Sequence, residues 1–157
     1  MPKGRKDLDF ISDTGEFRCQ LRVTWGTVFF DYDNDGDEDL YVASGFLDND
    51  PLPNRPEQPN LLLRNNGDGT FSDVSPLSGA APTGGIARGV AYGDFNGDGC
   101  LDLYVANLGR SSGAGESAKL FQNSCDWGNN WLAVKLQGTQ SNRDGIGARV
   151  TAVAGGQ

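Results

Sequence analysis

Residues 26–44 read GTVFFDYDNDGDEDLYVAS, and residues 89–107 read GVAYGDFNGDGCLDLYVAN. The two stretches superimpose without a gap at an offset of 63 residues, and nine of their nineteen positions are identical. Each stretch runs from an apolar segment through an acidic loop into the sequence Leu-Tyr-Val-Ala, whose β-branched and aromatic residues favour a strand. We therefore interpret the chain as an array of two copies of one structural unit.

A weaker similarity follows each copy and extends the repeat. Residues 62–65 (LLRN) and residues 120–123 (LFQN) lie 58 residues apart. Each unit then contains strand, acidic loop, strand, long loop, strand, turn and strand, which is the order expected in a blade of a β-propeller. The sequence predicts an all-β fold, a partial β-propeller-like array of two four-stranded antiparallel blades with D-x-D-x-D-G-x-x-D calcium loops.

The composition agrees with a fold made of short strands and turns. Glycine accounts for 23 of the 157 residues, about twice its ordinary usage. Residues 16–25 alternate strictly between apolar and polar side chains, as a half-buried strand does. Further strands are predicted at residues 28–30, 40–44, 61–64, 70–72, 90–92, 101–106, 119–122, 131–136 and 148–154.

The acidic loops have the spacing of a calcium-binding loop. Calcium takes about six to eight oxygen ligands, and a loop that coils around the ion presents side chains from positions 1, 3, 5 and 9 and a carbonyl from position 7. In the first copy these ligands are Asp31, Asp33, Asp35 and Asp39, with the carbonyl of Asp37. In the second copy they are Asp94, Asn96, Asp98 and Asp102, with the carbonyl of Cys100. The glycine after position 5 permits a sharp turn, and we predict two calcium sites.

Two other interpretations compete with calcium loops. An EF-hand requires a bidentate Glu at position 12 inside a helix, whereas that position holds Val42 and Val105, each within a strand-like sequence. Asp, Asn and Gly are also ordinary turn residues, so the loops would otherwise be plain polar turns. Two copies with their positions in register favour ligands. So do the six acidic residues within residues 31–39, whose mutual repulsion opposes folding without a cation.

The net charge and the missing residue types argue against several functions. Lys and Arg number 13 against 21 Asp and Glu, which gives a net charge of −8 and makes a nucleic-acid partner unexpected. The sequence has no histidine, which removes Ser-His-Asp triads, HExxH zinc sites and imidazole bases. No apolar stretch is long enough for a membrane helix, and no signal peptide is visible at residues 1–6.

The three cysteines, Cys19, Cys100 and Cys125, lack CxxC spacing, so a zinc or redox motif has little support. One disulfide and one free thiol fit the odd number. Cys100 and Cys125 lie in polar loop sequence, whereas Cys19 falls on the apolar side of an alternating run. Cys100 with Cys125 is therefore the preferred pair, and three unpaired thiols are the alternative.

The repeats resemble the FG-GAP or VCBS-type repeat of integrin α-chain propellers, whose D-x-D-x-D-G-x-x-D loops hold calcium. Residues 60–74 are similar to the second half of such repeats, and residues 130–156 resemble the opening of an ASPIC/UnbV domain. Together these matches cover most of residues 24–156. The resemblance implies an extracellular, secreted or cell-surface calcium-binding module of the β-propeller type, engaged in adhesion or protein interaction and without catalytic residues.

We accordingly expect an N-terminal arm or strand at residues 1–23, two repeats at residues 24–75 and 87–129, and the start of the ASPIC/UnbV-like segment at residues 130–157. The expected function is that of a calcium-binding extracellular interaction, adhesion or self-assembly module with structural calcium and no catalysis. Two blades leave strand edges and apolar faces uncovered. The expected partners are therefore another protein, or copies of the chain in a ring or a fibre, unless the chain is a fragment of a larger propeller.

An accessory or carbohydrate-binding domain of a secreted or biosynthetic enzyme system is the alternative function. Trp25, Trp127 and Trp131 are the residues that would stack on a sugar. Packing in the core or between the blades is the competing interpretation of these three side chains.

Overall fold

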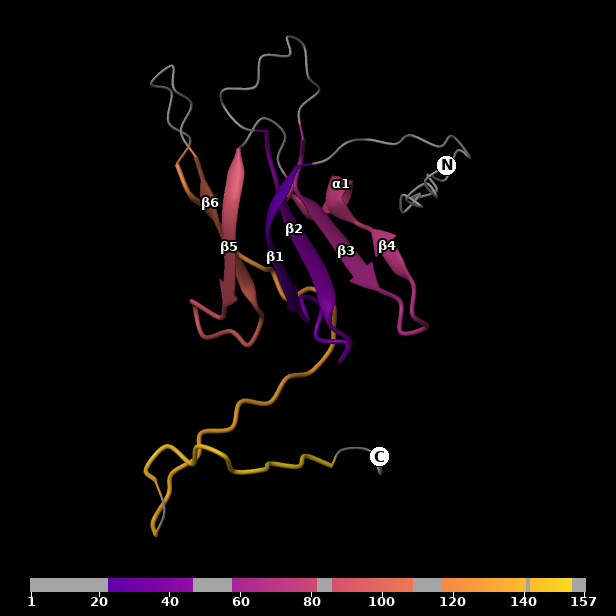
Figure 1. Cartoon of the computed structure of the whole chain (residues 1–157). Coiled ribbons are helices and arrows are strands. Elements are labelled where there is room, and N and C mark those ends of the chain that lie inside the picture. Colours follow the sequence, from indigo (N-terminus) through magenta and orange to yellow (C-terminus); the bar gives the residue numbers. More distant parts are fainter. Residues whose placement is uncertain (1–22, 47–57, 82–85, 109–116, 141, 154–157) are drawn as a thin grey trace, which may run out of the picture.

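The computed structural model describes residues 23–46, 58–81, 86–108, 117–140 and 142–153. These residues form two antiparallel sheets, and their one helix is the single turn α1 (Ser75–Ser78). The first sheet has the order β1 (Thr24–Phe30), β2 (Asp39–Ser44), β3 (Leu61–Asn65), β4 (Phe71–Asp73), and the second has the order β5 (Ala87–Gly93), β6 (Asp102–Asn107), β7 (Lys119–Phe121) (Figure 1). The prediction of an all-β fold with two antiparallel sheets is confirmed. Within these ranges, no helix has the length and apolar character needed to cross a bilayer.

Both sheets begin with the same hairpin. One acidic loop joins β1 to β2, and the other joins β5 to β6. The last pair of residues before each loop is also the same, because Phe30 lies opposite Asp39 and Gly93 lies opposite Asp102. Each hairpin has an irregularity of register near the start of its first strand. The repeat of sequence is therefore a repeat of backbone structure.

Among the residues that the structure describes, the second sheet has three strands, and the fourth strand predicted for it is not found there. The sequence predicts strands at residues 131–136 and 148–154, but residues 131–136 and the described part of the second range, 148–153, form none. They belong to a segment that leaves β7 and runs away from both sheets (Figure 1). A short strand is stable only where another backbone pairs with it. The backbone bonds recorded for this segment close turns instead, as from the amide of Gly138 to the carbonyl of Arg143 at 2.9 Å.

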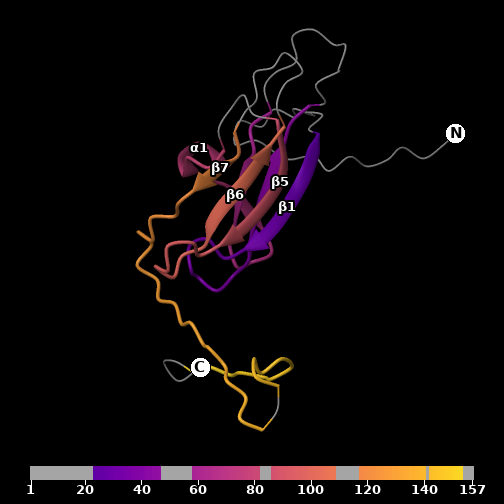
Figure 2. The same ribbon diagram turned by 90° about the vertical axis from the view of Figure 1, so that its left-hand side faces the viewer.

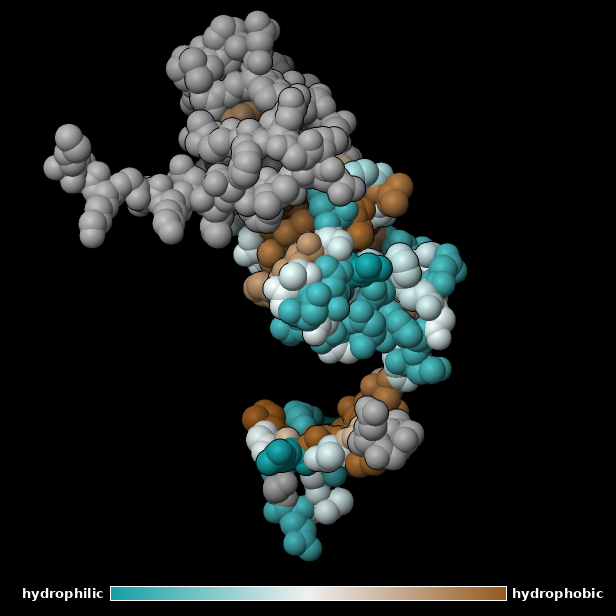
Figure 3. Space-filling model, turned by 90° about the vertical axis from the view of Figure 1, so that its right-hand side faces the viewer, coloured by the Kyte–Doolittle hydropathy of each residue, from teal (hydrophilic) through white to brown (hydrophobic). Residues whose placement is uncertain are grey.

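This C-terminal segment carries many exposed apolar side chains. Figure 3 shows hydrophobic side chains on the part of the molecule that lies apart from the sheets. The exposed apolar side chains of this segment include Leu132, Val134, Ile146, Val150 and Val153. The apolar character of residues 131–153 is therefore not sufficient to bury this segment in the core. The predicted arm at residues 1–23 falls almost wholly outside the residues that the structure describes.

The hydrophobic core lies between the two sheets. The first sheet contributes Phe30, Tyr41 and Leu62, and the second contributes Leu103 and Val105. Strand β5 runs beside β1, so the two sheets meet along their first strands (Figure 2). Burial of these side chains between the sheets supplies the main stabilising free energy that the structure shows.

Gly26 in β1 allows the sheets to approach closely. A Cβ atom at this position would lie 3.0 Å from the carbonyl oxygen of Arg88 and 3.1 Å from the amide nitrogen of Val90. The backbones of β1 and β5 are therefore almost in contact. Beside this contact, the rings of Phe30 and Tyr92 stack with their centroids 5.6 Å apart.

Arg88 fastens the second sheet to the first. Its guanidinium lies 4.2 Å from the centroid of the Trp25 ring and donates to the carbonyls of Gly45 at 3.3 Å and Phe46 at 2.9 Å. The indole N–H of Trp25 donates to the carbonyl of Gly45 at 2.7 Å. Trp25 thus packs between the blades, as the packing interpretation of the tryptophans expects.

The hydroxyl of Tyr41 connects three segments of the first sheet. It donates to the carbonyl of Ala80 at 2.5 Å and accepts the side-chain amide of Asn60 at 2.8 Å. The other end of the Asn60 side chain accepts the amide of Ser44 at 2.9 Å. Burial raises the pKa of Tyr41 to about 12, so the hydroxyl stays protonated and can donate.

The substitution Tyr41→Phe removes this hydroxyl and leaves the Asn60 amide and the Ala80 carbonyl short of a partner. We expect the free energy of unfolding, measured by urea denaturation, to fall by about 1–3 kcal/mol. Tyr104→Phe is the matched control, because Tyr104 holds the same place in the second repeat and is 49% exposed. The control should lose less than about 0.5 kcal/mol, and equal losses in both variants would contradict the role of the hydroxyl.

Candidate metal centre

The two acidic loops share one backbone conformation. Gly36 and Gly99, which follow position 5, have φ angles of 95° and 89°. Asn34 and Gly97, two positions earlier, are also left-handed, with φ angles of 55° and 77°. Side chains with a Cβ disfavour this region, so glycine after position 5 supplies the sharp turn that the sequence predicts. Both loops therefore coil in the same way.

The carboxylate at position 1 organises each coil. Asp31 accepts the backbone amides of Asp35 at 3.1 Å and Gly36 at 3.0 Å. Asp94 accepts the amides of Gly97 at 2.7 Å, Asp98 at 3.1 Å and Gly99 at 2.9 Å. In both copies, the loop thus curves around the carboxylate at position 1, which accepts hydrogen bonds from the backbone amides that follow it.

The carboxylate at position 9 joins the first loop to the end of β3 and the second loop to the segment just after β7. Asp39 accepts the amide of Tyr32 at 3.0 Å on one oxygen and that of Asn65 at 2.8 Å on the other. Asp102 does the same with the amides of Phe95 at 3.1 Å and Asn123 at 2.7 Å. Both carboxylates are almost completely buried. Sequence reasoning missed the roles of Asn65 and Asn123, although the LLRN and LFQN similarity was the signal for them.

The first loop brings three carboxylates together. Oxygens of Asp31, Asp33 and Asp39 all lie within 4.8 Å of one another. Asp33 is 6% exposed, and its Oδ1 atom is buried without a hydrogen-bond partner. A buried carboxylate oxygen without a partner is costly unless a cation or a proton compensates its charge. The geometry therefore fits a cation between these three side chains.

The two other predicted ligands of the first loop lie outside this cluster. Asp35 is exposed, and its side chain accepts the amide of Asp37 at 2.9 Å. The side chain of Asp37 lies against Gly67, where a Cβ atom would come within 2.9 Å of Oδ2. The predicted contribution of Asp37 is its backbone carbonyl, so this placement of its side chain does not conflict with the prediction.

The second loop gathers its side chains less closely. Asn96 donates its amide to Asp98 at 2.6 Å, and Asp98 accepts the amide of Cys100 at 2.9 Å. Among the residues described, Asp94, Asp98 and Asp102 do not form a cluster like that of the first loop. Asp98 does lie close to the sulfurs of Cys100 and Cys125. These two cysteines are bonded to each other, so they offer no thiolate to a metal.

Burial raises the pKa of two carboxyl groups in the first loop, those of Asp33 and Asp39. The pKa of Asp33 is raised by burial and then by the neighbouring Asp35 and Asp31 carboxylates. Burial raises the pKa of Asp39 to about 6, although the amides of Asn65 and Tyr32 act in the opposite direction. The first loop thus holds its negative charges at a cost, which a bound cation would offset.

The disulfide between Cys100 and Cys125 confirms the preferred pairing. It joins the second loop to the segment that follows β7, with 5.8 Å between the Cα atoms and a separation of 25 residues. Closing a loop of this length contributes roughly 3–4 kcal/mol in the chain-entropy estimate. Cys19 lies outside the described residues, so the prediction that it is a free thiol stays a prediction.

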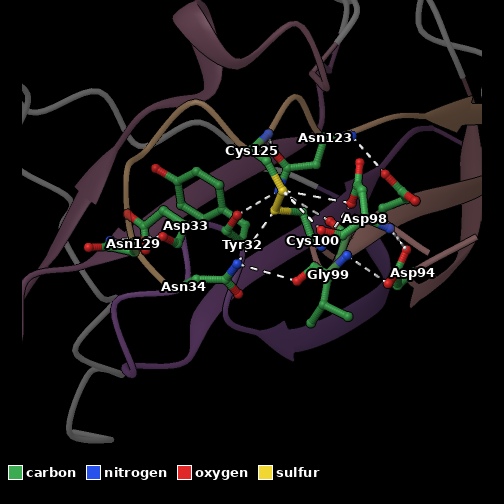
Figure 4. Close-up of a disulfide and its surroundings, with 12 residues drawn as sticks. Tyr32, Asp33, Asn34, Asp94, Asp98, Gly99, Cys100, Asn123, Cys125 and Asn129 are labelled. Atoms are coloured by element: carbon green, nitrogen blue, oxygen red, sulfur yellow. Dashed lines mark hydrogen bonds between the residues drawn. A yellow bond between two sulfur atoms is a disulfide. The ribbon is translucent and has the colours of Figure 1, made fainter. Parts of the chain in front are cut away.

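The segment that carries Cys125 also connects the two loops. The side-chain amides of Asn123 and Asn129 donate to the carbonyls of Tyr32 at 2.6 Å and Asp33 at 3.0 Å. From the first loop, the amide of Asn34 donates to the carbonyl of Gly99 at 3.3 Å (Figure 4). The two candidate metal loops therefore lie side by side and are cross-linked through hydrogen bonds and the disulfide.

Two tryptophans pack at the same end of the sheets. Trp127 meets the ring of Tyr32 edge to face, with 5.3 Å between the centroids. The indole of Trp131 occupies the place that a Cβ atom at Gly99 would take. Both side chains are 50% exposed, but their contacts are those of packing against the loops.

Residues 31–105, which contain both acidic loops, match the family described as FG-GAP-like repeat. Cartilage acidic protein 1 of Xenopus tropicalis is 45% identical over 49 residues, which are 31% of this chain and 8% of that protein. The Homo sapiens protein of the same name is 45% identical over 49 residues, or 31% of this chain and 7% of that protein. The similarity thus spans a small part of these relatives, and no solved structure matches the chain. The FG-GAP resemblance is confirmed for residues 31–105, and the VCBS and ASPIC/UnbV resemblances stay predictions.

The raised pKa of Asp39 predicts how the stability of the metal-free protein depends on pH. A carboxyl whose pKa is higher in the folded state stabilises the fold below its unfolded pKa, and this contribution is lost as the pH rises through about 6. In urea denaturation with EDTA, we expect the free energy of unfolding to fall between about pH 5 and about pH 7. The non-titrating Asp39→Asn variant should have a smaller dependence on pH. An unchanged slope in this variant would contradict the assignment.

Proposed function

We propose that this chain is a calcium-binding repeat module of extracellular proteins, in which calcium has a structural and not a catalytic role. The observation that carries the proposal is the cluster of Asp31, Asp33 and Asp39, with the buried and unpartnered Oδ1 atom of Asp33. A divalent cation bound in the cluster compensates the negative charge of these three carboxylates. It thereby fixes the coil between β1 and β2.

The donor set favours calcium over softer metals. Every predicted side-chain ligand in the first loop, from Asp31 to Asp39, is a carboxylate, and the remaining predicted ligand is the carbonyl of Asp37. Oxygen ligands suit hard cations such as calcium and magnesium, whereas zinc and copper favour nitrogen and sulfur. A flexible coil of this length accommodates the larger coordination number of calcium better than the strict octahedron of magnesium.

A second calcium ion is proposed for the second loop on the basis of the repeat. Its ligands are Asp94, Asn96, Asp98 and Asp102, with the carbonyl of Cys100. The equivalent coil and the equivalent hydrogen bonds at positions 1 and 9 support this site. The neutral Asn96 and the looser arrangement of the carboxylates lead us to expect weaker binding than in the first loop.

Calcium stabilises the fold in this proposal because binding and folding are linked. A cation held by Asp39 acts on the loop, on β2 and, through the amide of Asn65, on the end of β3. An ion that binds only the folded chain adds about 2.7 kcal/mol when its free concentration is 100 times its dissociation constant. The calcium-free chain is then folded less stably.

The similarity to known proteins supports an extracellular role in protein interaction or adhesion. It consists of the FG-GAP-like match at residues 31–105 and the short stretch shared with cartilage acidic protein 1. A disulfide such as Cys100–Cys125 is typical of oxidising compartments. The sequence has no histidine, and the acidic residues of the first loop are explained as metal ligands, which supports a module without catalysis.

Removal of calcium is expected to lower the melting temperature by several degrees. A change of about 1 kcal/mol shifts the midpoint of a domain of this size by about 2–4 °C. Differential scanning fluorimetry in EDTA should show the fall, and calcium should reverse it more effectively than magnesium. The same melting temperature with EDTA and with calcium would remove the proposed calcium sites.

Substitution of the ligands should separate the two loops. Asp31→Ala is expected to reduce the calcium-induced rise in melting temperature more than Asn96→Ala, because Asp31 is a charged ligand of the cluster and Asn96 is neutral. Asp144→Ala is the control, since it removes an exposed carboxylate outside both loops. Equal calcium responses in all three variants would contradict the ligand assignment.

A further inference from the structure

The second sheet has an apolar face that no other described residue covers. This outer face carries Ala91, Phe95, Tyr104 and Leu120, which line a shallow groove. The other lining residues are Tyr92 and Gly93 at the end of β5, the exposed Asp94 and the buried Asp102. Figure 2 is viewed from the side on which this sheet lies. Phe95, Tyr104 and Leu120 are 57%, 49% and 52% exposed, respectively.

A comparison of the two repeats shows how the equivalent positions of the first sheet are packed. Tyr104 corresponds to Tyr41 of the first sheet at the offset of 63 residues, and Leu120 corresponds to Leu62 at the offset of 58 residues. Tyr41 is 0% exposed and Leu62 is 3% exposed. Phe95 likewise corresponds to Tyr32, which is 7% exposed. The same positions are therefore buried in one repeat and open in the other.

At these positions the first sheet packs in one buried cluster with the inner face of the second sheet and with Ala80, while Trp127 packs on Tyr32. That inner face carries Tyr92, Leu103 and Phe121, which lie opposite one another across β5, β6 and β7. Leu103 belongs to the core, Phe121 packs against it, and the ring of Tyr92 stacks on Phe30. The contact between the repeats thus joins two different faces of the same structural unit.

The surface equivalent to this inner face is present on the first sheet. Phe29, Leu40 and Leu63 correspond to Tyr92, Leu103 and Phe121, and they too lie opposite one another across three strands. We name these three residues the Phe29 face. Phe29 is 53% exposed, and the two leucines are half-buried. One chain therefore carries both halves of the contact that its own two sheets make.

The glycines of the first strands agree with this correspondence. Gly26 lets β5 approach β1, since a Cβ atom there would meet the backbone of Arg88 and Val90. Gly89 holds the equivalent place in β5, and a Cβ atom there would meet nothing closer than the Cβ of Ala106 at 3.7 Å. The outer face thus keeps room for the close approach of another strand.

We propose that the outer face binds a second copy of this chain through the Phe29 face of that copy, so that copies associate head to tail. The contact continues the interface between the two sheets and is heterologous, which leads to rings or open chains according to the rotation per copy. The proposal rests on the proposed function in one respect. Calcium in the second loop neutralises the exposed Asp94 of the groove and thereby lowers the repulsion between two acidic chains.

Sedimentation velocity of the full chain in calcium buffer tests the association. We expect the average mass to rise above that of the monomer as the concentration increases through the micromolar range. Tyr104→Lys and, separately, Leu120→Lys should abolish this rise while the melting temperature stays unchanged, because both side chains are half exposed. Leu77→Lys is the control, since Leu77 is an exposed apolar residue on α1, away from both faces, and should leave the association intact.

A mixing experiment tests the head-to-tail arrangement. Tyr104→Lys removes the outer face and Phe29→Lys removes the Phe29 face, so each variant alone is expected to stay monomeric. Their mixture keeps one intact pair of faces and should form a dimer of twice the monomer mass that grows no further. Dimers of Phe29→Lys alone would overturn the proposal, because they would show that outer faces pair with each other.

Other outcomes also separate the hypotheses. A wild-type chain that remains monomeric at all concentrations would overturn the proposed contact, while a calcium-induced rise in melting temperature would still support the proposed function. If association persists in Tyr104→Lys and Leu120→Lys but is lost in Val134→Lys, the C-terminal segment and not the outer face is the contact. An unchanged melting temperature in EDTA would refute the calcium sites independently of the mass.

Discussion

The buried carboxylate at position 9 of each acidic loop is the contact on which both sheets depend. Asp39 and Asp102 each accept one amide from the beginning of their own loop and a second amide from Asn65 at the end of β3 or from Asn123 just after β7. One side chain thus holds the coil, the second strand and the third strand together. A buried carboxylate is tolerated only when its oxygens are hydrogen-bonded or compensated by a cation. The same hydrogen bonds therefore hold both the sheets and the candidate metal loops in place.

The stacking of the two sheets follows from the two unlike faces of the repeated unit. A single four-stranded sheet cannot bury its own apolar face. The side chains of that face are covered only when a second unit packs against it. Here Leu103 and Val105 of the second unit pack in one buried cluster with Tyr41 and Leu62 of the first. Two units satisfy one such contact and leave one face of each kind on the outside. The exposed Tyr104 and Phe29 are the direct result.

The repeat could be predicted from the sequence because its signals are local. Alternating Asp, Asn and Gly between β-branched segments marks the loops, and seven of the predicted strands are found close to their predicted places, from residues 28–30 to residues 119–122. The strands predicted at residues 131–136 and 148–154 are not found in the described residues, because an apolar pattern does not reveal whether a strand edge lies nearby. The amides of Asn65 and Asn123 depend on contacts across 26 and 21 residues, which a reading of each loop by itself does not find.

The two loops reach the same coil by different means. The first loop has three converging carboxylates and one unpartnered oxygen, so its own hydrogen bonds leave negative charge uncompensated. The second loop replaces the position 3 carboxylate with Asn96, whose amide donates to Asp98, and the disulfide at Cys100 holds position 7 covalently. The second loop therefore has less repulsion between its side chains and is also held by a covalent bond. A cation would stabilise it less than the first loop. Under the proposed calcium binding, the first loop is therefore the one whose stability depends more strongly on the ion, and the disulfide constrains the second loop even without one.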